Sequence, residues 1–284
     1  MSVPGVPSQV TPVAAPISAT GDGRGAEFVQ SLERGLSVIR AFGPERSRLT
    51  LTDVARATGL TRAAARRFLL TLVELGYVGS DGRDFSLLPR VLELGYAYLS
   101  GLSLPEVAQP LLEELVGRVH ESSSITVLDG DDIVYVVRCP TKRIMTVAIS
   151  VGSRLPAYCT AMGRVLLAAL PPEGLERYLD RVTLVARTGR TCTDPAELRR
   201  ILAQVADDGH AAVDQELEDG LVSIAVPIRD ASGAVTAACN VSASAVRVDV
   251  PTLVRDVLPE LAATTAQIED GLRGLAAPAF DPPA

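Results

Sequence analysis

Three arginines that lie close together in the sequence carry side chains suited to an anionic partner. They occur in TLTDVARATGLTRAAARRFLLTLVELGYV, residues 50–78, as Arg62, Arg66 and Arg67. An arginine can donate two hydrogen bonds to the O6 and N7 atoms of guanine, and it also binds phosphate. A small neighbour such as Ala63 would let a helix approach base edges closely and contact a thymine methyl. These residue types predict a helix that enters the major groove of DNA.

The same stretch supplies the elements that would position this helix. Gly59 suits the left-handed residue that ends a first helix. Thr50 or Thr52 can cap that helix and Thr61 can cap the next, because a hydroxyl accepts from free first-turn N–H groups. The apolar residues, at helical spacing in the second helix, are Leu51, Val54, Ala55, Leu60, Phe68, Leu69, Leu72 and Leu75. The stretch is predicted to form a helix-turn-helix.

The flanking segments extend this prediction to a whole domain. Residues 27–42 predict a helix that packs behind the helix-turn-helix through one apolar face, formed by Phe28, Leu32, Leu36, Ile39 and Phe42. Asp81-Gly82, between two extended arms, predicts a two-residue hairpin with positive φ at both positions. A hairpin directly after a recognition helix is a wing. Residues 25–88 are therefore predicted to be a winged helix-turn-helix DNA-binding domain.

Six residues of this domain are expected to contact DNA: Thr61, Arg62, Ala63, Arg66, Arg67 and Arg83. Arg62 and Arg66 would lie near bases or flanking phosphates, and Arg67 and Arg83 would contact mostly phosphate. One alternative is that some of these arginines are solvated or pair with Glu74 or Asp53. Another is that the module binds protein rather than DNA.

The distribution of charge is compatible with DNA binding even though the net charge of the chain is −7. Residues 24–90 hold eleven Arg against seven Asp or Glu, a charge of +4, whereas the remainder holds 16 basic and 27 acidic residues, a charge of −11. A locally basic module on an acidic body is expected of a DNA-binding regulator, because phosphate contact is local. A charge of +4 over this length is also within ordinary variation.

Composition limits the class of protein further. The 284 residues are enough for two domains. Residues 1–24 predict a disordered tail rather than a signal peptide, and 274–284 predict a second tail. No apolar run approaches the roughly 20 residues that span a bilayer, so a soluble protein with no membrane partner is expected. The scattered cysteines are expected to be reduced thiols of a cytoplasmic protein. The four cysteines, even with His120 and His210, show no zinc-binding spacing, so neither a metal nor a cofactor is predicted.

The second half of the chain predicts a different fold. Pro89 opens a predicted linker helix over 89–104, which either packs on a partner subunit or belongs within one domain. A helix from Pro105 is followed by short β-rich runs that alternate with helices. Residues 105–273 are therefore predicted to be an α+β domain with an antiparallel sheet and helices on its faces. Within it, Gly130-Asp131 and Ser232-Gly233 predict hairpin turns, and Asp194, Pro195 and Glu197 predict a capping box.

Several of these stretches resemble one family of bacterial transcriptional regulators, the IclR family. In the first half the similar segments are SLERGLSVIRAF, LTLTDVARATGLTRAAARRFLLTL and ELGYV. In the second half VGSRLPAYCTAMGRVLLAAL resembles the effector-loop segment and DQELEDGLVSIAVPIRDASGAVTAACNVS the closing sheet. The resemblance covers roughly residues 27–272 in the order of the family. RIMTVAISVGSRLPAYCTAMGRVLLA is similar to the PcaR/PcaU/PobR group, which controls β-ketoadipate-pathway genes for protocatechuate and 4-hydroxybenzoate breakdown.

The resemblance implies a GAF-like effector domain with a cleft over its sheet, and a homodimer or dimer of dimers. By position, effector contacts would come from Tyr158, Cys159, Thr160, Ala161, Met162, Ser223, Asn240 and Ser242. The chain departs from the family pattern at Val213, where many members carry an acid, and at Asn240, where some carry cysteine or serine.

The chemistry of these positions suits a small organic acid. Free N–H groups at a helix start at Ala161 and Met162 would bind a carboxylate. Tyr158 and Met162 could stack on an aromatic ring, and Ser223, Asn240 and Ser242 would offer neutral donors. Candidate carboxylate partners, each of which could instead be a surface arginine, are Arg138, Arg143 and Arg154.

We therefore expect a DNA-binding regulator of a catabolic operon whose effector is a small aromatic acid such as protocatechuate or 4-hydroxybenzoate. An IclR-type regulator of another small-organic-acid or sugar route is the nearest alternative. A metabolite-processing enzyme on the second domain is the alternative of another class. It is disfavoured because Cys159, as a nucleophile, would have only His120 and His210 as possible bases.

Overall fold

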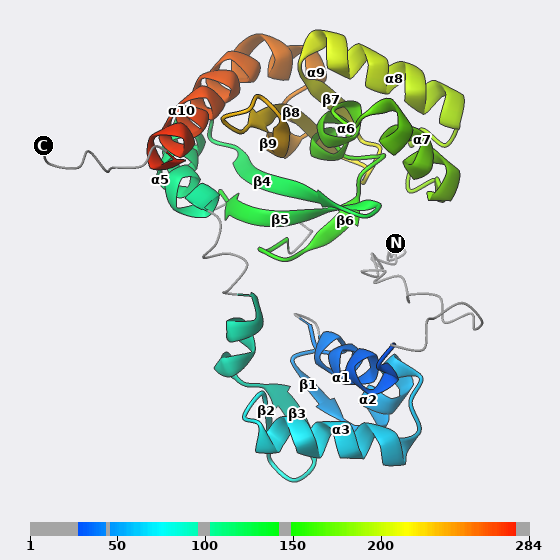
Figure 1. Cartoon of the computed structure of the whole chain (residues 1–284). Helices are drawn as coiled ribbons and strands as arrows, with labels where there is room; N and C mark the ends of the chain where they lie inside the picture. Colours follow the sequence, from blue (N-terminus) through cyan, green and yellow to red (C-terminus); the bar gives the residue numbers. More distant parts are fainter. Residues whose placement is uncertain (1–27, 44–45, 96–102, 142–148, 277–284) are drawn as a thin grey trace, which may run out of the picture. The chain divides into compact units, whose positions relative to one another are not determined.

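The computed structural model describes residues 28–43, 46–95, 103–141 and 149–276. The chain forms two compact units, Met1–Leu94 and Gly95–Ala284 (Figure 1). No helix in the described part of the chain is both long and apolar enough to cross a membrane.

The first unit is a helix-turn-helix followed by a hairpin. Its helices are α1 (Gln30–Arg40), α2 (Leu51–Thr58) and α3 (Arg62–Glu74), and its strands are β1 (Arg48–Thr50), β2 (Val78–Ser80) and β3 (Asp84–Leu87). The three strands form one antiparallel sheet in the order β1-β3-β2. The predicted winged helix-turn-helix architecture is confirmed.

Local sequence accounts for the start and end of each of the two central helices. The Thr50 hydroxyl accepts from the Asp53 N–H at 3.2 Å and the Asp53 carboxylate accepts from the Thr50 N–H at 3.1 Å, which forms a capping box on α2. Gly59 ends α2 with φ of 67°. Thr61 caps α3 by accepting from the Ala64 N–H at 3.2 Å.

The wing differs from the predicted turn by one position. Asp81 faces Asp84 across the hairpin, so its two central residues are Gly82 and Arg83 rather than Asp81 and Gly82. Gly82 alone of the wing residues has positive φ, 95°. Asp81 instead tightens the turn through its carboxylate, which accepts from the N–H groups of Arg83 and Asp84 at 3.1 and 2.8 Å.

The predicted apolar face of α1 packs only in part. Val38 is fully buried and Phe42 is nearly so, but Leu32 is 63% exposed and Leu36 is 47% exposed. Phe28 also lies on the surface. The contact with α2 and α3 therefore comes from the C-terminal half of α1, and the N-terminal half presents an apolar surface in the single chain. This corrects the prediction that the whole face is covered within the domain.

Only the beginning of the predicted linker helix is described. Pro89–Leu92 form a 3₁₀-helix, labelled η1, that continues as helical residues to Gly95. The remainder of the predicted helix up to Leu102 lies outside the described residues. The next helix, α5 (Ser103–Val119), begins two residues before the predicted start at Pro105.

The second unit is built on a six-stranded antiparallel sheet in the order β6-β5-β4-β9-β8-β7. The strands are β4 (Ser122–Asp129), β5 (Asp132–Cys139), β6 (Arg154–Pro156), β7 (Ala211–Asp214), β8 (Leu221–Arg229) and β9 (Val235–Ser244). The predicted turns at Gly130-Asp131 and Ser232-Gly233 connect β4 to β5 and β8 to β9. This confirms the predicted α+β class with an antiparallel sheet.

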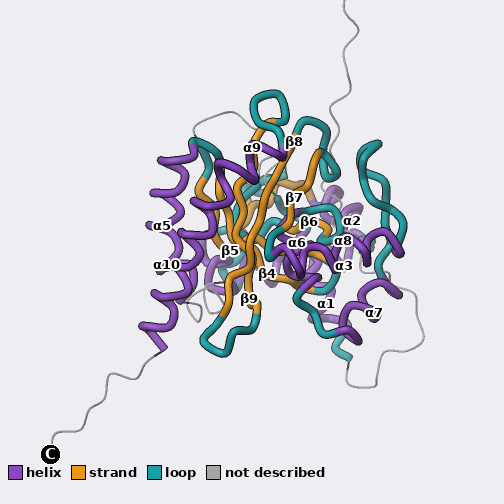
Figure 2. The backbone as a smooth tube through the Cα atoms, turned by 90° about the horizontal axis from the view of Figure 1, so that it is seen from above, coloured by secondary structure: helices purple, strands orange, loops and turns teal. Residues whose placement is uncertain are grey.

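Helices cover both faces of this sheet (Figure 2). On one face α5 packs beside the C-terminal helical segment, which runs through α9 (Val250–Thr252), the π-helix η2 (Leu253–Val257) and α10 (Leu258–Ala276). The other face carries α6 (Ala161–Ala168), α7 (Pro172–Arg181) and α8 (Pro195–Asp208). Helix α7 was not predicted from the sequence, although it buries Tyr178 and Leu179.

Helix α6 is pressed against the chain that precedes it. A Cβ atom added to Gly163 would lie 2.1 Å from the Ala157 carbonyl oxygen and 2.4 Å from the Ala157 Cα. No side chain fits there without moving backbone, so a glycine at this position sets the distance between α6 and residues 156–158.

We therefore expect Gly163→Ala to lower the free energy of unfolding of the second unit by at least about 1–3 kcal/mol through overpacking. The matched control is Gly117→Ala in α5, where a Cβ meets nothing within 4 Å. That change should raise stability by up to about 1 kcal/mol because alanine is the better helix former. Urea unfolding of both variants checks this, and equal effects of the two would contradict the close contact.

Candidate functional sites

Helix α3 presents the predicted DNA-contacting residues on one exposed side. Ala65, Leu69 and Leu72 are buried against the rest of the first unit. The predicted contacts are all exposed: Thr61, Arg62, Ala63, Arg66 and Arg67 at α3, and Arg83 in the wing. This division follows from the helical spacing of the apolar residues.

The arginines on this side are available to a partner. Within the described residues, Arg62, Arg66, Arg67 and Arg83 form no ion pair. Asp53, one of the alternative partners considered from the sequence, lies instead nearest to Arg56, at 3.9 Å. Unpaired exposed guanidinium groups on a recognition helix and its wing are the arrangement that contact with DNA phosphates and bases requires.

The second unit contains a cavity between its sheet and the start of α6. The space among the lining residues, which includes open solvent, is ≈ 500 Å³. Its lining is mostly apolar and is formed by Tyr135, Arg138, Ile149, Cys159, Thr160, Ala161, Met162, Val213, Leu217, Leu221, Ser223, Asn240 and Ser242. Of the predicted effector contacts, this set lacks Tyr158 and Arg154.

A bulge in β5 places two functional side chains on the same face. The pairing of β4 with β5 shifts between Ile125 and Thr126, so Val136 is an extra residue on β5. Without the bulge, residues three apart would point to opposite faces of the sheet. With it, Tyr135 and Arg138 both reach the cavity. Tyr135 was missed from the sequence, because strict alternation hides it.

Arg138 is the cation of the cavity. It is half-buried, and burial lowers its pKa below the ordinary value. Its one described polar partner is the Ser124 hydroxyl, at 3.3 Å, and no carboxylate of the described residues pairs with it. An uncompensated guanidinium in a largely apolar cavity favours an anionic ligand.

Arg154 does not have this role. The Arg154 guanidinium pairs with Asp129 and, at 3.2 Å, with Asp132. The charge of Arg154 is therefore balanced by carboxylates at the surface, away from the cavity lining. Arg143 lies outside the described residues.

Tyr158 does not line the cavity, although it was predicted to contact the effector. It is 2% exposed, and its hydroxyl donates to the Val185 carbonyl at 2.7 Å and accepts from the Val185 N–H at 3.2 Å. Tyr158 is therefore not placed to stack on a ligand ring as expected, and its hydroxyl instead fixes the backbone at Val185. Met162 does line the cavity, where its sulfur accepts from the Thr126 hydroxyl at 3.3 Å.

The start of α6 meets the cavity with free donors. Thr160 caps the helix by accepting from the Gly163 N–H at 3.2 Å. The first-turn N–H groups of Ala161 and Met162 have no partner within the helix, as at any helix start. Both residues line the cavity, which agrees with the carboxylate-binding role considered from the sequence.

The thiol of Cys159 is buried and unsuited to nucleophilic chemistry. Burial raises the pKa of this thiol to about 11, so it is protonated at neutral pH. Among the described residues, no group of three or more His, Cys, Asp or Glu side chains could hold a metal ion.

Comparison with known proteins identifies the family. Residues 31–82 match the IclR helix-turn-helix domain, and residues 96–270 match the family described as bacterial transcriptional regulator IclR C-terminal. The chain belongs to the IclR family.

Individual relatives of this IclR-family chain are named as transcriptional regulators. It is 50% identical over 250 residues to the Pca regulon regulatory protein of Pseudomonas putida, covering 88% of this chain and 85% of the relative. It is 36% identical to the p-hydroxybenzoate hydroxylase transcriptional activator of Acinetobacter baylyi, covering 87% and 93%. Among solved structures, an IclR homolog from Microbacterium hydrocarbonoxydans complexed with 4-hydroxybenzoate is similar with a TM-score of 0.76 and 29% identity, covering 86% and 99%.

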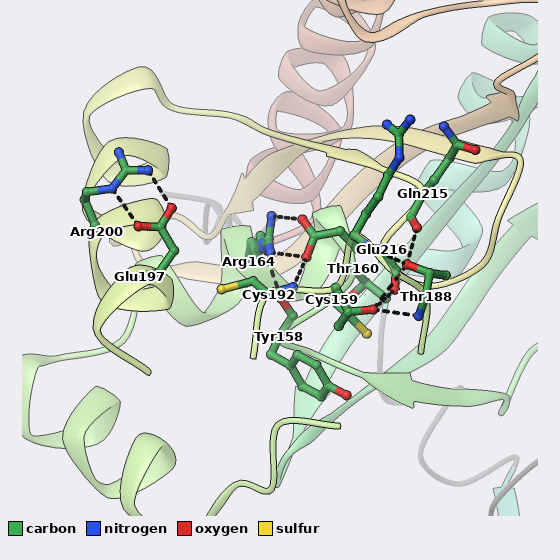
Figure 3. A network of polar contacts seen from close by, with 12 residues as sticks. Tyr158, Cys159, Thr160, Arg164, Thr188, Cys192, Glu197, Arg200, Gln215 and Glu216 are labelled. Atoms are coloured by element: carbon green, nitrogen blue, oxygen red, sulfur yellow. Dashed lines mark hydrogen bonds and ion pairs between the residues drawn. The ribbon is translucent and has the colours of Figure 1, made fainter. Parts of the chain in front are cut away.

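A buried ion pair holds the walls of the cavity in this IclR-family chain together (Figure 3). The Arg164 guanidinium of α6 binds both carboxylate oxygens of Glu216 at 2.7 Å, and the two side chains are 4% and 12% exposed. Arg164 also donates to the Tyr158 carbonyl at 3.0 Å, and the Cys192 N–H donates to Glu216 at 2.9 Å. One pair thus joins α6, the loop before β8 and the segment before α8.

The same region corrects one predicted cap. Asp194 caps α8 by accepting from the Ala196 N–H at 3.0 Å. Glu197 does not complete a capping box, because its carboxylate binds Arg200 one turn along the helix at 2.6 and 2.9 Å (Figure 3).

Removal of Glu216 should leave the Arg164 charge buried without a counter-ion. We expect Glu216→Ala to lower the free energy of unfolding by about 3–5 kcal/mol. Glu216→Gln, which keeps hydrogen-bond acceptance, should cost less. The control is Glu176→Ala, which breaks a two-bond pair with Arg199 on the surface between α7 and α8 and should change stability little. Thermal and urea unfolding measure all three, and equal losses at Glu216 and Glu176 would contradict this role.

Proposed function

We propose that this chain is a transcriptional regulator of an aromatic-acid catabolic operon, whose affinity for operator DNA depends on an aromatic acid bound in the cavity of the second unit. The observation that carries the proposal is Arg138, an uncompensated cation in an otherwise largely apolar cavity beside a helix start. That combination suits a carboxylate attached to a flat apolar body.

The relatives support the same ligand class. The Pseudomonas relative is named for the Pca regulon and the Acinetobacter relative for p-hydroxybenzoate hydroxylase. The Microbacterium homolog was crystallised with 4-hydroxybenzoate. Protocatechuate and 4-hydroxybenzoate are therefore the effectors proposed here. The alternative within the family is a regulator that responds to another small organic acid or to a sugar-derived one.

DNA recognition is assigned to α3 and the wing, with Arg62 and Arg66 nearest to bases and Arg67 and Arg83 on phosphates. A homodimer or dimer of dimers would present paired recognition helices to paired half-sites. The exposed apolar surface of α1 at Leu32 and Leu36 is compatible with a covered face in such an assembly. Such a regulator acts in the bacterial cytoplasm, where its DNA target lies.

The effector assignment predicts different effects on ligand affinity for Arg138 and Arg154, which were both candidate carboxylate partners from the sequence. Arg138→Gln should weaken binding of 4-hydroxybenzoate and protocatechuate by about 10- to 100-fold, because a charged hydrogen-bond partner is lost. Arg154→Gln should change it little, because Arg154 is paired with Asp129 and Asp132. Isothermal titration of the full-length protein measures both affinities. Wild-type binding by Arg138→Gln would contradict the assignment.

The regulatory part of the proposal is tested on DNA. A duplex selected by the wild-type protein from a random pool supplies the probe, and fluorescence anisotropy measures its affinity with and without saturating 4-hydroxybenzoate or protocatechuate. A reproducible change of affinity supports the proposal. The absence of any change with both acids, in protein shown by calorimetry to bind them, would contradict effector control.

Arg66→Ala should separate the two functions. We expect it to weaken binding to the selected duplex by about 1–3 kcal/mol and to relax the base preference at the contacted position, because Arg66 is assigned to bases. Effector-induced thermal stabilisation should be unchanged. The control Arg177→Ala removes the same charge from an exposed arginine of α7 that has no described ion pair. Loss of effector-induced stabilisation in Arg66→Ala would contradict the assignment of DNA binding and effector binding to separate units.

A further inference from the structure

Three polar side chains on the sheet side of the cavity use all of their hydrogen-bond donors among themselves and the backbone. The Ser223 hydroxyl donates to the Val241 carbonyl at 3.3 Å, and the Ser242 hydroxyl donates to the Ser223 oxygen at 3.2 Å. The two hydrogens of the Asn240 amide are directed to Ser223 at 3.0 Å and Ser242 at 2.7 Å. The cluster was expected from the sequence to offer donors to a ligand, and the structure leaves none to offer.

The direction of the amide follows from the hydroxyl of Ser223. Because that hydroxyl gives its hydrogen to a backbone carbonyl, its oxygen can only accept from the other members of the cluster. The group of Asn240 that faces it must therefore be the NH₂, and the carbonyl oxygen Oδ1 must point elsewhere. Asn240 is 4% exposed, and its Oδ1 has no hydrogen-bond partner among the described residues.

A buried acceptor without a partner is uncommon, because its desolvation is not compensated. Asn240 lines the cavity, so the missing partner is available from a molecule that enters it. An acceptor repels a carboxylate and requires a donor. Asn240 Oδ1 and Arg138 therefore select opposite chemical groups within one cavity.

The sheet register places these two groups apart but in line. Ser124 of β4 is paired with Arg138 of β5 on one side and with Asn240 of β9 on the other. Arg138 and Asn240 thus lie two strand spacings apart, about 10 Å between backbones. Both residues line the cavity, so one small acid bound there can meet the guanidinium and the amide oxygen.

We propose that Asn240 Oδ1 is a specificity-determining acceptor that selects aromatic acids carrying an uncharged hydroxyl group remote from the carboxylate. This inference rests on the proposed function of the cavity and adds to it the group that distinguishes hydroxylated from unsubstituted acids. Benzoate would fill the same space and leave Oδ1 without a partner. A site built around a hydroxyl rejects the analogue that lacks one for this reason.

The test compares ligands that differ in one group. Isothermal titration of the full-length protein measures the affinities of benzoate, 4-fluorobenzoate, 3-hydroxybenzoate, 4-hydroxybenzoate and 3,4-dihydroxybenzoate. In the wild type, the best hydroxylated acid should bind about 10- to 100-fold more tightly than benzoate and 4-fluorobenzoate. In Asn240→Leu and Asn240→Ala this ratio should fall to near 1, while the affinity for benzoate stays within a few-fold. The control Thr265→Val removes a buried hydroxyl that bonds the Leu261 and Ala262 carbonyls within α10, away from the cavity lining, and it should keep the wild-type ratio.

The outcomes are distinguishable. A ratio near 1 in the wild type, or a ratio that survives both Asn240 variants, overturns the inference while leaving the proposed effector class standing. Equal loss of benzoate and hydroxybenzoate binding in the Asn240 variants also overturns it, because the amide would then contact the carboxylate. If none of the five acids binds to the wild type, the proposed function fails, and this inference fails with it.

Discussion

The ion pair between Arg164 and Glu216 is the interaction on which the structure of the second unit depends most. Two charges are removed from water, and four bonds offset that cost: two between the side chains, one from Arg164 to the Tyr158 carbonyl and one from the Cys192 N–H to Glu216. The partners belong to segments far apart in the chain. This pair brings residues 156–164, 188–192 and 214–217 together, with further bonds from the Thr188 hydroxyl to the Gln215 carbonyl and from the Thr191 hydroxyl to the Glu216 carbonyl.

The cavity follows from this arrangement. Gly163 lets α6 approach Ala157, and the ion pair holds the loop that carries Leu217 against the same helix. The sheet contributes the polar groups, because the bulge at Val136 turns Tyr135 and Arg138 to one side. Burial raises the pKa of the Tyr135 hydroxyl to about 12, so it remains neutral beside the guanidinium. A cation, a neutral phenol and an amide oxygen are thus held on a rigid sheet, which is where a small acid can be read with specificity.

The sequence predicted the elements of this structure better than their contacts. Caps at Thr50 and Thr61 and the turn at Gly130 depend on neighbouring residues only, and all appear as expected. Predictions were wrong where a contact depends on a residue outside the local pattern. Leu32 and Leu36 of α1 look like core residues but find no surface to cover in the single chain, and Glu197 binds Arg200 instead of its cap.

In the site, too, positions along the chain were predicted better than the contacts that the side chains make. The start of α6 and the residues Ser223, Asn240 and Ser242 could be placed from the sequence, because a resemblance fixes their position. Whether an arginine faces a cavity or a carboxylate could not be decided, since Arg154 meets Asp129 and Asp132 only through strand pairing. Tyr135 is hidden by a bulge that no local pattern reveals, and the donors of the Asn240 cluster are consumed by contacts across β8 and β9.

The central claim is that an aromatic acid binds between α6, the loop before β8 and strand β9. Hydrogen–deuterium exchange of the full-length protein with and without saturating 4-hydroxybenzoate tests it most directly. The account predicts slower exchange in residues 158–166, 213–223 and 238–243. Saturation that leaves these three segments unchanged, with protection found elsewhere in the chain, would contradict it.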